Sequence, residues 1–158
     1  MIRIGHSNDI HRLEEGHQLM IGGVLVPHDK GSVGHSDADC LLHTVCESLL
    51  GALALGDLGK LFPDTSLEFK GINSSILVQR VMKIISDKGY HVVNMDSTIF
   101  LERPKVQEYI PSMRRNIAAL LNIDIEFVSV KATTGERVGI IGREEAIMAE
   151  SVVLLSND

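Results

Sequence analysis

Three side chains that can bind a metal ion stand out in the sequence: Asp9, His11 and His43. Asp9 and His11 are two residues apart in a segment with strand character, so both side chains leave the same face of a strand. One carboxylate and two imidazoles suit zinc or another divalent first-row metal, and catalytic zinc sites commonly keep one position open beside three protein ligands. The alternative is that the Asp-x-His pair decorates a surface or caps a turn.

His43 belongs to a segment with helical periodicity. Ser36 and Asp37 are expected to accept hydrogen bonds from the free N–H groups at the start of this helix. Asp39, His43 and Glu47 recur every four residues and form a polar stripe. Asp39 is therefore a candidate to orient His43 from outside the ligand set. The other face of the helix is apolar, with Leu42, Val45, Cys46, Leu49, Leu50 and Leu53.

Two further stretches have the composition of anion sites. His35 and Ser36 lie at the predicted helix start, where free N–H groups attract anions. Thr133, Thr134 and Glu136 lie in a glycine-containing loop after a strand, where hydroxyls can hold a phosphate and a carboxylate can recruit a hard cation. The alternatives are a simple helix cap and an ordinary turn. Three cations near breaks in the pattern could contact phosphates or be solvated surface charges: Lys105, Lys131 and Arg143.

The composition indicates a single domain with an aliphatic core. The chain has 158 residues, of which 44% are hydrophobic and 4% aromatic, and its net charge of −6 argues against a nucleic-acid surface built on bulk positive charge. No apolar run reaches the roughly 18–20 residues of a membrane span. The strand pattern begins directly after Met1, so we expect no signal peptide.

The two cysteines point to a reducing compartment. Cys40 and Cys46 lie six residues apart in one predicted helix, on different faces, so a disulfide between them is not expected. Cys40 is a rival ligand three residues before His43. A single thiol without a partner is more often a small buried hydrophobe.

Strand-like and helix-like segments alternate along the chain. Strands are expected over 2–10, 18–21, 24–26, 91–101, 127–132 and 146–155, with Gly22-Gly23 as a tight hairpin turn. Helices are expected from Ser36 or Asp37 to Gly56, from Asn73 or Ser74 to Gly89, and from Pro111 onward. The segments 27–34, 57–65 and 133–139 are expected to be loops. This pattern predicts an α+β domain over 1–158, with a mixed four- to five-stranded sheet, helices packed on one face and a small hairpin.

Several short motifs occur together in a fixed order. They are Gly5-His6-Ser7-Asn8-Asp9-Ile10-His11, His35-Ser36-Asp37-Ala38-Asp39, Leu50-Gly51-Ala52, the run from Gly56 to Thr65, and Lys131-Ala132-Thr133-Thr134-Gly135-Glu136. In these motifs, over nearly its whole length, the chain resembles the 2-C-methyl-D-erythritol 2,4-cyclodiphosphate synthases of the non-mevalonate isoprenoid pathway. The resemblance implies a homotrimer with an active site at each subunit boundary, and the cysteines above fit a cytoplasmic location. It also implies an intramolecular phosphoryl transfer that closes a cyclic diphosphate and releases CMP from a cytidine diphosphate substrate.

The resemblance also implies roles for individual residues. Asp9, His11 and His43 would hold Zn²⁺, and Glu136 would help hold a Mg²⁺ or Mn²⁺ that bridges the diphosphate. His35 and Thr134 would stabilise the transition state. Substrate binding is implied for Asp9, His11, His35, Ser36, Asp57, Leu58, Gly59, Phe62, Pro63, Asp64, Thr65, Ser66, Leu101, Lys105, Ala132, Thr133, Thr134, Glu136, Ile140 and Arg143.

Within this set, the resemblance places 57–59 and 62–66 around the erythritol moiety. It places 101–107 and 132–134 around the cytidine, supplied by a neighbouring subunit, with Lys105 on a phosphate. Arg143 would point to a ligand on the trimer axis. Two other functions stay open: a zinc-dependent phosphohydrolase that uses metal-bound water, and a non-catalytic trimer that binds isoprenoid diphosphates.

Overall fold

A computed structural model describes residues 1–63 and 67–158. Its elements, in chain order, are β1 (Ile2–Glu15), β2 (Leu19–Ile21), β3 (Val24–Val26), β4 (Lys30–Ser32), α1 (Cys40–Ala52), α2 (Leu58–Leu61), η1 (Leu67–Phe69), α3 (Ser74–Asp87), β5 (His91–Phe100), α4 (Ile110–Leu121), η2 (Ile125–Phe127), β6 (Val128–Thr133), α5 (Gly139–Gly142) and β7 (Ala146–Ser156).

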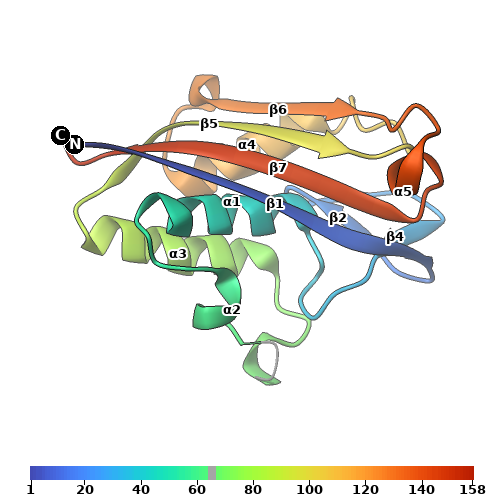
Figure 1. Cartoon of the computed structure of the whole chain (residues 1–158), viewed down its shortest axis with the longest axis horizontal. Helices are drawn as coiled ribbons and strands as arrows, with labels where there is room; N and C mark the ends of the chain where they lie inside the picture. The colour runs from blue at the N-terminus through green and yellow to red at the C-terminus, as the bar shows by residue number, and fades with distance from the viewer. Residues whose placement is uncertain (64–66) are drawn as a thin grey trace.

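In the described part of the chain, five strands form one mixed sheet in the order β4-β1-β7-β5-β6 (Figure 1). Among the strand pairs of the described residues, only β5–β6 is parallel, and β1 pairs with β7 over almost its whole length. Strands β2 and β3 form a separate hairpin, whose turn residues Gly22 and Gly23 have φ angles of 59° and 74°. The predicted α+β class, mixed sheet and hairpin are confirmed.

Helices α1, α3 and α4 pack on one side of the sheet and on one another (Figure 1). Helix α1 lies directly against β1 and β7. At Gly5 the contact is so close that an added Cβ atom would lie 1.8 Å from the backbone oxygen of Ser48. Glycine at this position therefore lets strand and helix backbones touch, which brings the ligands on β1 next to the one on α1.

Several predicted boundaries are wrong, each for a local reason. Strand β1 continues to Glu15 because its end pairs with β4, which lies inside the expected loop 27–34. Helix α1 starts at Cys40, with Asp39 as its N-cap, so Ser36 and Asp37 do not cap it. It ends at Ala52, before Gly56, and Ala54 then adopts a left-handed φ of 55°. The short helix α2 lies inside the expected loop 57–65, and the short helix α5 begins at the last residue of the expected loop 133–139.

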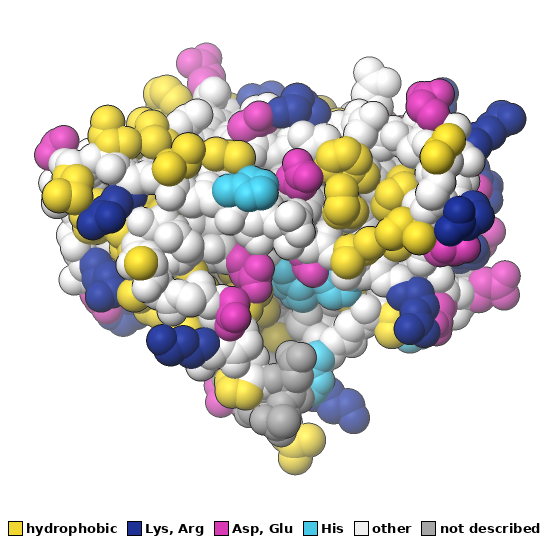
Figure 2. Space-filling view, in the orientation of Figure 1, with side chains coloured by type: hydrophobic (Ala, Val, Ile, Leu, Met, Phe, Trp, Pro, Cys, Tyr) yellow, Lys and Arg dark blue, Asp and Glu magenta, His cyan; other side chains and the backbone are white. Residues whose placement is uncertain are grey.

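The other face of the sheet carries large apolar side chains on β1 and β7. Ile4 is 69% exposed and Ile2 is 64% exposed, and Ile10 and Val152 on the same face are also exposed. Figure 2 shows hydrophobic side chains gathered over these strands. Among the described residues, no helix combines the length and the apolar character that a membrane crossing requires. Exposed apolar patches on protein surfaces are typical of interaction sites.

Candidate metal centre

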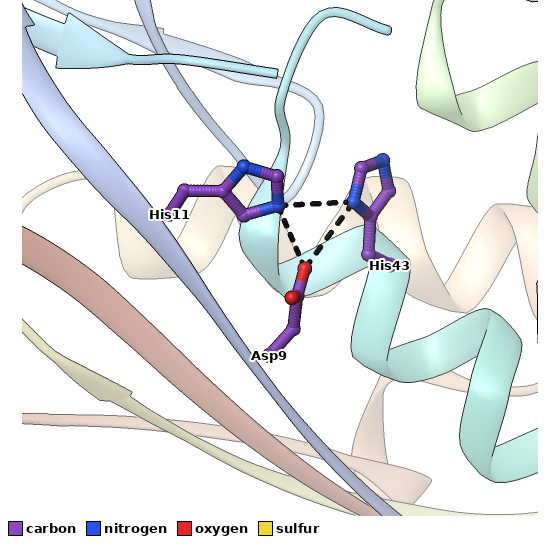
Figure 3. Close-up of side chains that lie close together, drawn as sticks. All are labelled: Asp9, His11 and His43. Atoms are coloured by element: carbon purple, nitrogen blue, oxygen red, sulfur yellow. Dashed lines mark hydrogen bonds and ion pairs between the residues drawn. The ribbon is translucent and has the colours of Figure 1, made fainter. Parts of the chain in front are cut away.

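Asp9, His11 and His43 converge on one point (Figure 3). The distance from Asp9 Oδ2 to His11 Nε2 is 2.7 Å and from Asp9 Oδ2 to His43 Nδ1 is 3.3 Å. His11 Nε2 and His43 Nδ1 are 3.2 Å apart. A tetrahedral ion with bonds of 2.0–2.1 Å would hold its ligand atoms roughly 3.3 Å apart. The donor set and two of the three distances therefore fit a small divalent cation, and the predicted convergence is confirmed.

The position of each ligand follows from its element. Asp9 and His11 lie on β1 and point to the helix side of the sheet, as expected from their spacing of two residues. The Nδ1 atom of His11 lies 3.0 Å from the carbonyl oxygen of Val33. Because a carbonyl only accepts, Nδ1 carries a proton there, and Nε2 is the ring atom that faces the cluster.

The cluster is electrostatically coupled before any cation binds. Burial works against the ionised form of Asp9, but the His11 and His43 rings, whose nitrogens lie 2.7 and 3.3 Å from its Oδ2, hold the pKa of its carboxyl well below the usual range. Burial also lowers the pKa of His11, and the hydrogen bond and charge of Asp9 outweigh it, so the pKa of His11 is raised. A negative carboxylate is therefore available as a ligand at neutral pH, and a proton on His11 competes with the cation.

Asp39 does not orient His43, contrary to the expectation from the helical stripe. Its carboxylate is fully buried and accepts hydrogen bonds from the backbone N–H groups of Gly22, Gly23 and Leu42, at 2.9, 2.7 and 3.0 Å. It thus caps α1 and fixes the β2–β3 hairpin against the helix start. These three backbone donors direct the Asp39 carboxylate toward the hairpin and the helix start, so it is not available to orient the His43 ring one turn away.

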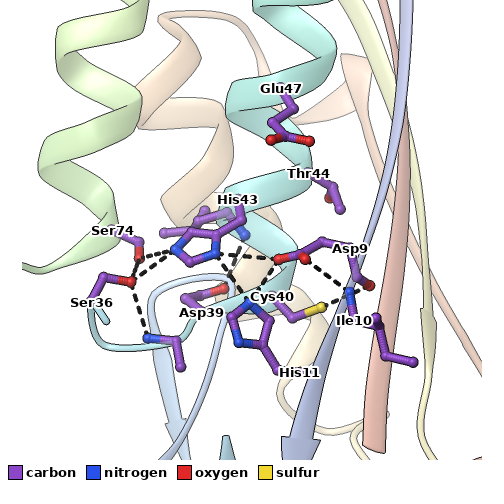
Figure 4. Close-up of polar contacts among 12 residues, drawn as sticks. Asp9, Ile10, His11, Ser36, Asp39, Cys40, His43, Thr44, Glu47 and Ser74 are labelled. Atoms are coloured by element: carbon purple, nitrogen blue, oxygen red, sulfur yellow. Dashed lines mark hydrogen bonds and ion pairs between the residues drawn. The ribbon is translucent and has the colours of Figure 1, made fainter. Parts of the chain in front are cut away.

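Cys40 is excluded from the cluster by its position. Its thiol lies 3.2 Å from the backbone oxygen of Asp9, to which it donates (Figure 4). Burial raises the pKa of the Cys40 thiol far above its usual range, so it stays protonated and is a poor metal ligand. Cys40 and Cys46 are both free, as predicted.

A cavity of about 320 Å³ opens beside the three ligands. Figure 2 shows histidine and acidic side chains at a hollow beneath β1. The residues that line the cavity are Asp9, His11, Gly34, His35, Ser36, His43, Glu47, Leu58, Gly59, Phe62, Ile72 and Leu77. His35, Ser36, Leu58, Gly59 and Phe62, for which the resemblance implies contact with substrate, thus lie at the wall of this cavity.

Asp57 and Pro63, also predicted to bind substrate, are not among the residues that line this cavity. Asp57 caps α2 through a hydrogen bond from the Lys60 N–H at 3.0 Å, and Pro63 is exposed. The predictions for 64–66, namely Asp64, Thr65 and Ser66, lie outside the described residues.

Glu47 is a cavity residue for which the sequence predicts no individual role. It lines the cavity and accepts a hydrogen bond from Ser7 at 2.9 Å. Its place in the polar stripe with His43 was the available signal.

A second cavity, of about 240 Å³, lies where the parallel strands β5 and β6 end. It is lined by Leu101, Glu102, Pro104, Lys105, Val106, Gln107, Ala132, Thr133 and Thr134. The two segments are held together by a hydrogen bond from the N–H of Leu101 to the oxygen of Thr133, at 3.0 Å. These are the segments that the resemblance grouped as one pocket, and the structure places them together.

Thr134 and Glu136 belong to this second region and not to the metal cavity. The hydroxyl of Thr134 lies 3.1 Å from Glu136 Oε1, and Gly135 donates to Glu102 at 2.9 Å. Strand β6 is separated from β1 by β7 and β5. Three strand spacings amount to about 14 Å, so one chain alone does not bring Glu136 to the Asp9 cluster.

Of the cations predicted to contact phosphates, two pair with carboxylates and one lies in the second cavity. Lys131 forms an ion pair with Asp96. Arg143 contacts Glu145 through two nitrogens, at 2.9 and 3.2 Å. Lys105 lies in the second cavity, and Ile140 is 43% exposed on the short helix α5. Lys105 is therefore the cation placed best for a ligand of that cavity.

Comparison with known proteins agrees with the fold and the clusters. Residues 2–156 match the YgbB family. The 2-C-methyl-D-erythritol 2,4-cyclodiphosphate synthase of Chlorobium phaeobacteroides is 53% identical over 98% of this chain and 97% of its own length. The bifunctional IspDF from Campylobacter jejuni superposes with a TM-score of 0.94 at 36% identity, over 98% of this chain and 42% of that chain. A synthase of the same name in its CDP-bound form has a TM-score of 0.90 and 31% identity, over 98% and 100% of the two chains.

Proposed function

Because the chain belongs to the YgbB family of 2-C-methyl-D-erythritol 2,4-cyclodiphosphate synthases, we propose that Asp9, His11 and His43 form the metal centre of that activity. The chain is a CMP-releasing lyase of isoprenoid biosynthesis. Its reaction converts 4-diphosphocytidyl-2-C-methyl-D-erythritol 2-phosphate to 2-C-methyl-D-erythritol 2,4-cyclodiphosphate. The observation that carries the site assignment is the convergence of three ligand atoms at the wall of a cavity.

The reaction exchanges one phosphorus–oxygen bond for another. An oxygen of the 2-phosphate bonds to the phosphorus nearer the erythritol, and that phosphorus loses its bond to the bridging oxygen, which leaves with CMP. Such a transfer needs alignment and charge neutralisation more than covalent help. Zn²⁺ bound to the three ligands would supply a Lewis acid for a diphosphate oxygen.

The remaining cavity residues would position the substrate. His35 and Ser36 line the cavity beside the ligands and would donate hydrogen bonds to phosphate oxygens where charge develops. Leu58, Gly59 and Phe62, which also line the cavity, would contact the erythritol moiety, with Asp57 at the start of α2. The apolar side chains among them would limit the access of water to the phosphates.

The cytidine pocket is proposed to be the second cavity, supplied by a neighbouring subunit. A solved relative binds CDP, which establishes a nucleotide site in that protein. Here the second cavity combines apolar walls with Lys105, Thr133 and Thr134, a suitable set for a nucleotide base and its phosphate. Thr134 would act with His35 on the transition state. Glu136, next to it, would help hold Mg²⁺ or Mn²⁺ on the diphosphate.

We propose that the chain forms a homotrimer with active sites between subunits. Two features support this assembly. The exposed apolar side chains Ile2, Ile4 and Val152 provide a contact surface on the sheet. The metal cavity and the Thr134 region, both needed for the reaction, lie about three strand spacings apart in one chain. Arg143 and Ile140 would then lie near the trimer axis.

The cytoplasm is the proposed location, with a small molecule as substrate and neither nucleic acid nor membrane as partner. The two free, buried thiols are compatible with a reducing compartment. The net charge of −6 does not favour binding to nucleic acid.

Product analysis in ¹⁸O-labelled water tests this function against a zinc-dependent phosphohydrolase and a non-catalytic binding protein. The purified protein, loaded with zinc and magnesium, is incubated with the cytidine substrate. We expect CMP and the cyclic diphosphate in equal amounts, with no ¹⁸O in either product. Incorporation of ¹⁸O would indicate hydrolysis, and the absence of turnover would leave only a binding function.

A further inference from the structure

His43 is held from its far side by two hydroxyl groups. Its Nε2 atom, which points away from the metal cluster, lies 2.9 Å from Ser36 Oγ and 3.1 Å from Ser74 Oγ (Figure 4). Ser74 is the first residue of α3 and its side chain is fully buried. Helix α3 thus reaches the metal centre although it supplies no ligand.

A carboxylate fixes the direction of these hydrogen bonds. Asp37 accepts a hydrogen bond from the Ser74 hydroxyl through Oδ1, and its Oδ2 accepts from the Ser74 backbone N–H at 3.0 Å. A carboxylate oxygen only accepts, so the single hydroxyl proton of Ser74 is donated to Asp37. Toward His43, the Ser74 oxygen can then act only as an acceptor. A proton on Nε2 is the arrangement that gives this acceptor a donor, and it leaves the lone pair of Nδ1 for the cluster.

We propose that Ser74 and Asp37 are positioning residues for the metal centre. Together they select the His43 tautomer that binds a cation through Nδ1, and they fix the plane of the ring. The chain of contacts runs from Asp37 to Ser74, then to His43 and the ligand cluster. Outer partners of this kind commonly orient a metal-ligating histidine and increase its basicity. This inference rests on the proposed metal centre.

Ser36 has a different place in the network. Its hydroxyl oxygen accepts a hydrogen bond from the Ala38 N–H at 3.2 Å and lies 3.5 Å from Ser74 Oγ. The Ser36 proton is therefore not committed to a carboxylate by these contacts, and Ser36 does not dictate the tautomer. Replacement of Ser36 should weaken zinc binding less than replacement of Ser74.

The test measures zinc affinity and the His43 tautomer in the same variants. Zinc dissociation constants come from competition with a chromogenic chelator, and the tautomer from ¹⁵N chemical shifts of the histidine rings in metal-free protein. For Ser74→Ala we expect about 10- to 100-fold weaker zinc binding and a mixture of His43 tautomers. Asp37→Asn, which preserves the side-chain shape, should weaken binding less and shift the tautomer in the same direction.

Ser48→Ala is the matched control. Ser48 is also a fully buried serine, but its hydroxyl donates to the Val45 backbone oxygen within α1, at 2.9 Å. This variant should bind zinc like the wild type, whatever it does to the melting temperature.

The inference is overturned if folded Ser74→Ala and Asp37→Asn proteins bind zinc as tightly as the wild type and retain the Nε2–H tautomer. It is equally overturned if His43 in the wild type carries its proton on Nδ1. Should the wild type not bind zinc at all, the proposed function fails. The tautomer measurement in metal-free protein still decides the role of Ser74 and Asp37.

Discussion

At the metal centre, each imidazole is held through the ring nitrogen that does not face the cluster. His11 is held by the Val33 carbonyl at 3.0 Å, and His43 by the hydroxyls of Ser36 and Ser74. The ring orientations are thus set by the protein before a cation arrives. Preorganisation of this kind raises affinity because little side-chain freedom is lost on binding.

Replacement of one ligand tests the cluster as a unit. Loss of an outer partner can weaken metal binding by about 100-fold, and His43→Ala, which removes a ligand itself, should weaken zinc binding by more than this. CMP release should fall in parallel. Zinc content by atomic emission and CMP release by chromatography measure the two effects. His17→Ala, at an exposed histidine in the turn after β1, is the control and should change neither. CMP release that survives without zinc would refute the metal assignment.

The stability of the metal-free protein should depend on pH through Asp9 and His11. The pKa of His11 is raised above 6.5, so its stabilising contribution is complete below that pH and is lost as the pH rises through the raised value. The pKa of Asp9 is lowered below 3.8, so its contribution is present above that pH and is lost only at stronger acidity. The pair therefore stabilises the fold most between pH 3.8 and 6.5.

Urea unfolding at a series of pH values in the presence of a chelator measures this profile, with Asp9→Asn as the comparison. The wild type should lose stability above pH 6.5 relative to the variant. Zinc affinity should change in the opposite sense and increase with pH, because protons compete with the cation for His11. Parallel stability profiles for the two proteins would contradict the coupling.

The ligand residues were predictable from the sequence, but their outer partners were not. A strand spacing of two residues is enough to put Asp9 and His11 on one face. The helical stripe predicts Asp39, on the same helix, as the hydrogen-bond partner that orients His43. In the structure Ser74, on α3, lies at hydrogen-bond distance from the His43 ring. Contacts between elements that are distant in sequence leave no periodic signal in either element.

At the scale of elements, the contact between β1 and α1 determines the site. The two backbones meet at Gly5, where an added Cβ would lie 1.8 Å from the Ser48 oxygen and 2.8 Å from the Ala52 nitrogen. Asp9 and His11 come from the strand and His43 comes from the helix. Any displacement of one element against the other therefore changes the distances within the cluster.

Gly5→Ala should push α1 away from β1. We expect a loss of about 1–3 kcal/mol in the free energy of unfolding, as for other overpacked sites, together with weaker zinc binding. Gly51→Ala is the control, because among the described residues outside the backbone of α1 the nearest atom to a Cβ added there is the His6 oxygen, at 4.0 Å. As a helical Gly→Ala change it should stabilise by about 0.5–1 kcal/mol. Equal effects of the two substitutions on urea unfolding would contradict the close contact.

Long elements with a clear apolar period were predicted well, and short ones were not. Helix α3 starts after Asn73, as its capping side chain suggested, and the hairpin turns at Gly22-Gly23. Strand β4, whose sequence is Lys30-Gly31-Ser32, has no apolar alternation and exists because β1 pairs with it. Helices α2 and α5, of four residues each, are too short to show a period.

At the scale of the whole molecule, the two cavities are separated within one chain. The metal cavity lies between β1 and α1, and the second cavity lies at the far edge of the sheet, at the ends of β5 and β6. Assembly of several chains is the direct way to bring them together. The sequence itself showed only an excess of aliphatic residues; which of them remain exposed is seen only in the structure.

Ile4→Glu tests the assembly. Ile4 is 69% exposed, so the charge should change the stability of one subunit little, but it should disrupt packing between sheets. Analytical ultracentrifugation should show trimers for the wild type and monomers for the variant. CMP release should fall by about 100-fold, the scale of loss from a misplaced binding group.

Ile76→Glu is the control on the exposed side of α3, where the side chain is 41% exposed. It should remain trimeric and active. A monomeric wild type with full activity, or an active monomeric Ile4→Glu variant, would contradict a site shared between subunits.

The most direct test of the metal centre is a crystal structure of the zinc-soaked protein with anomalous diffraction recorded on both sides of the zinc absorption edge. One anomalous peak per chain should lie about 2.0–2.2 Å from Asp9 Oδ2, His11 Nε2 and His43 Nδ1, with a fourth position open to the cavity. A peak elsewhere, a peak at Cys40, or a closed set of four protein ligands would contradict a catalytic metal centre at this cluster.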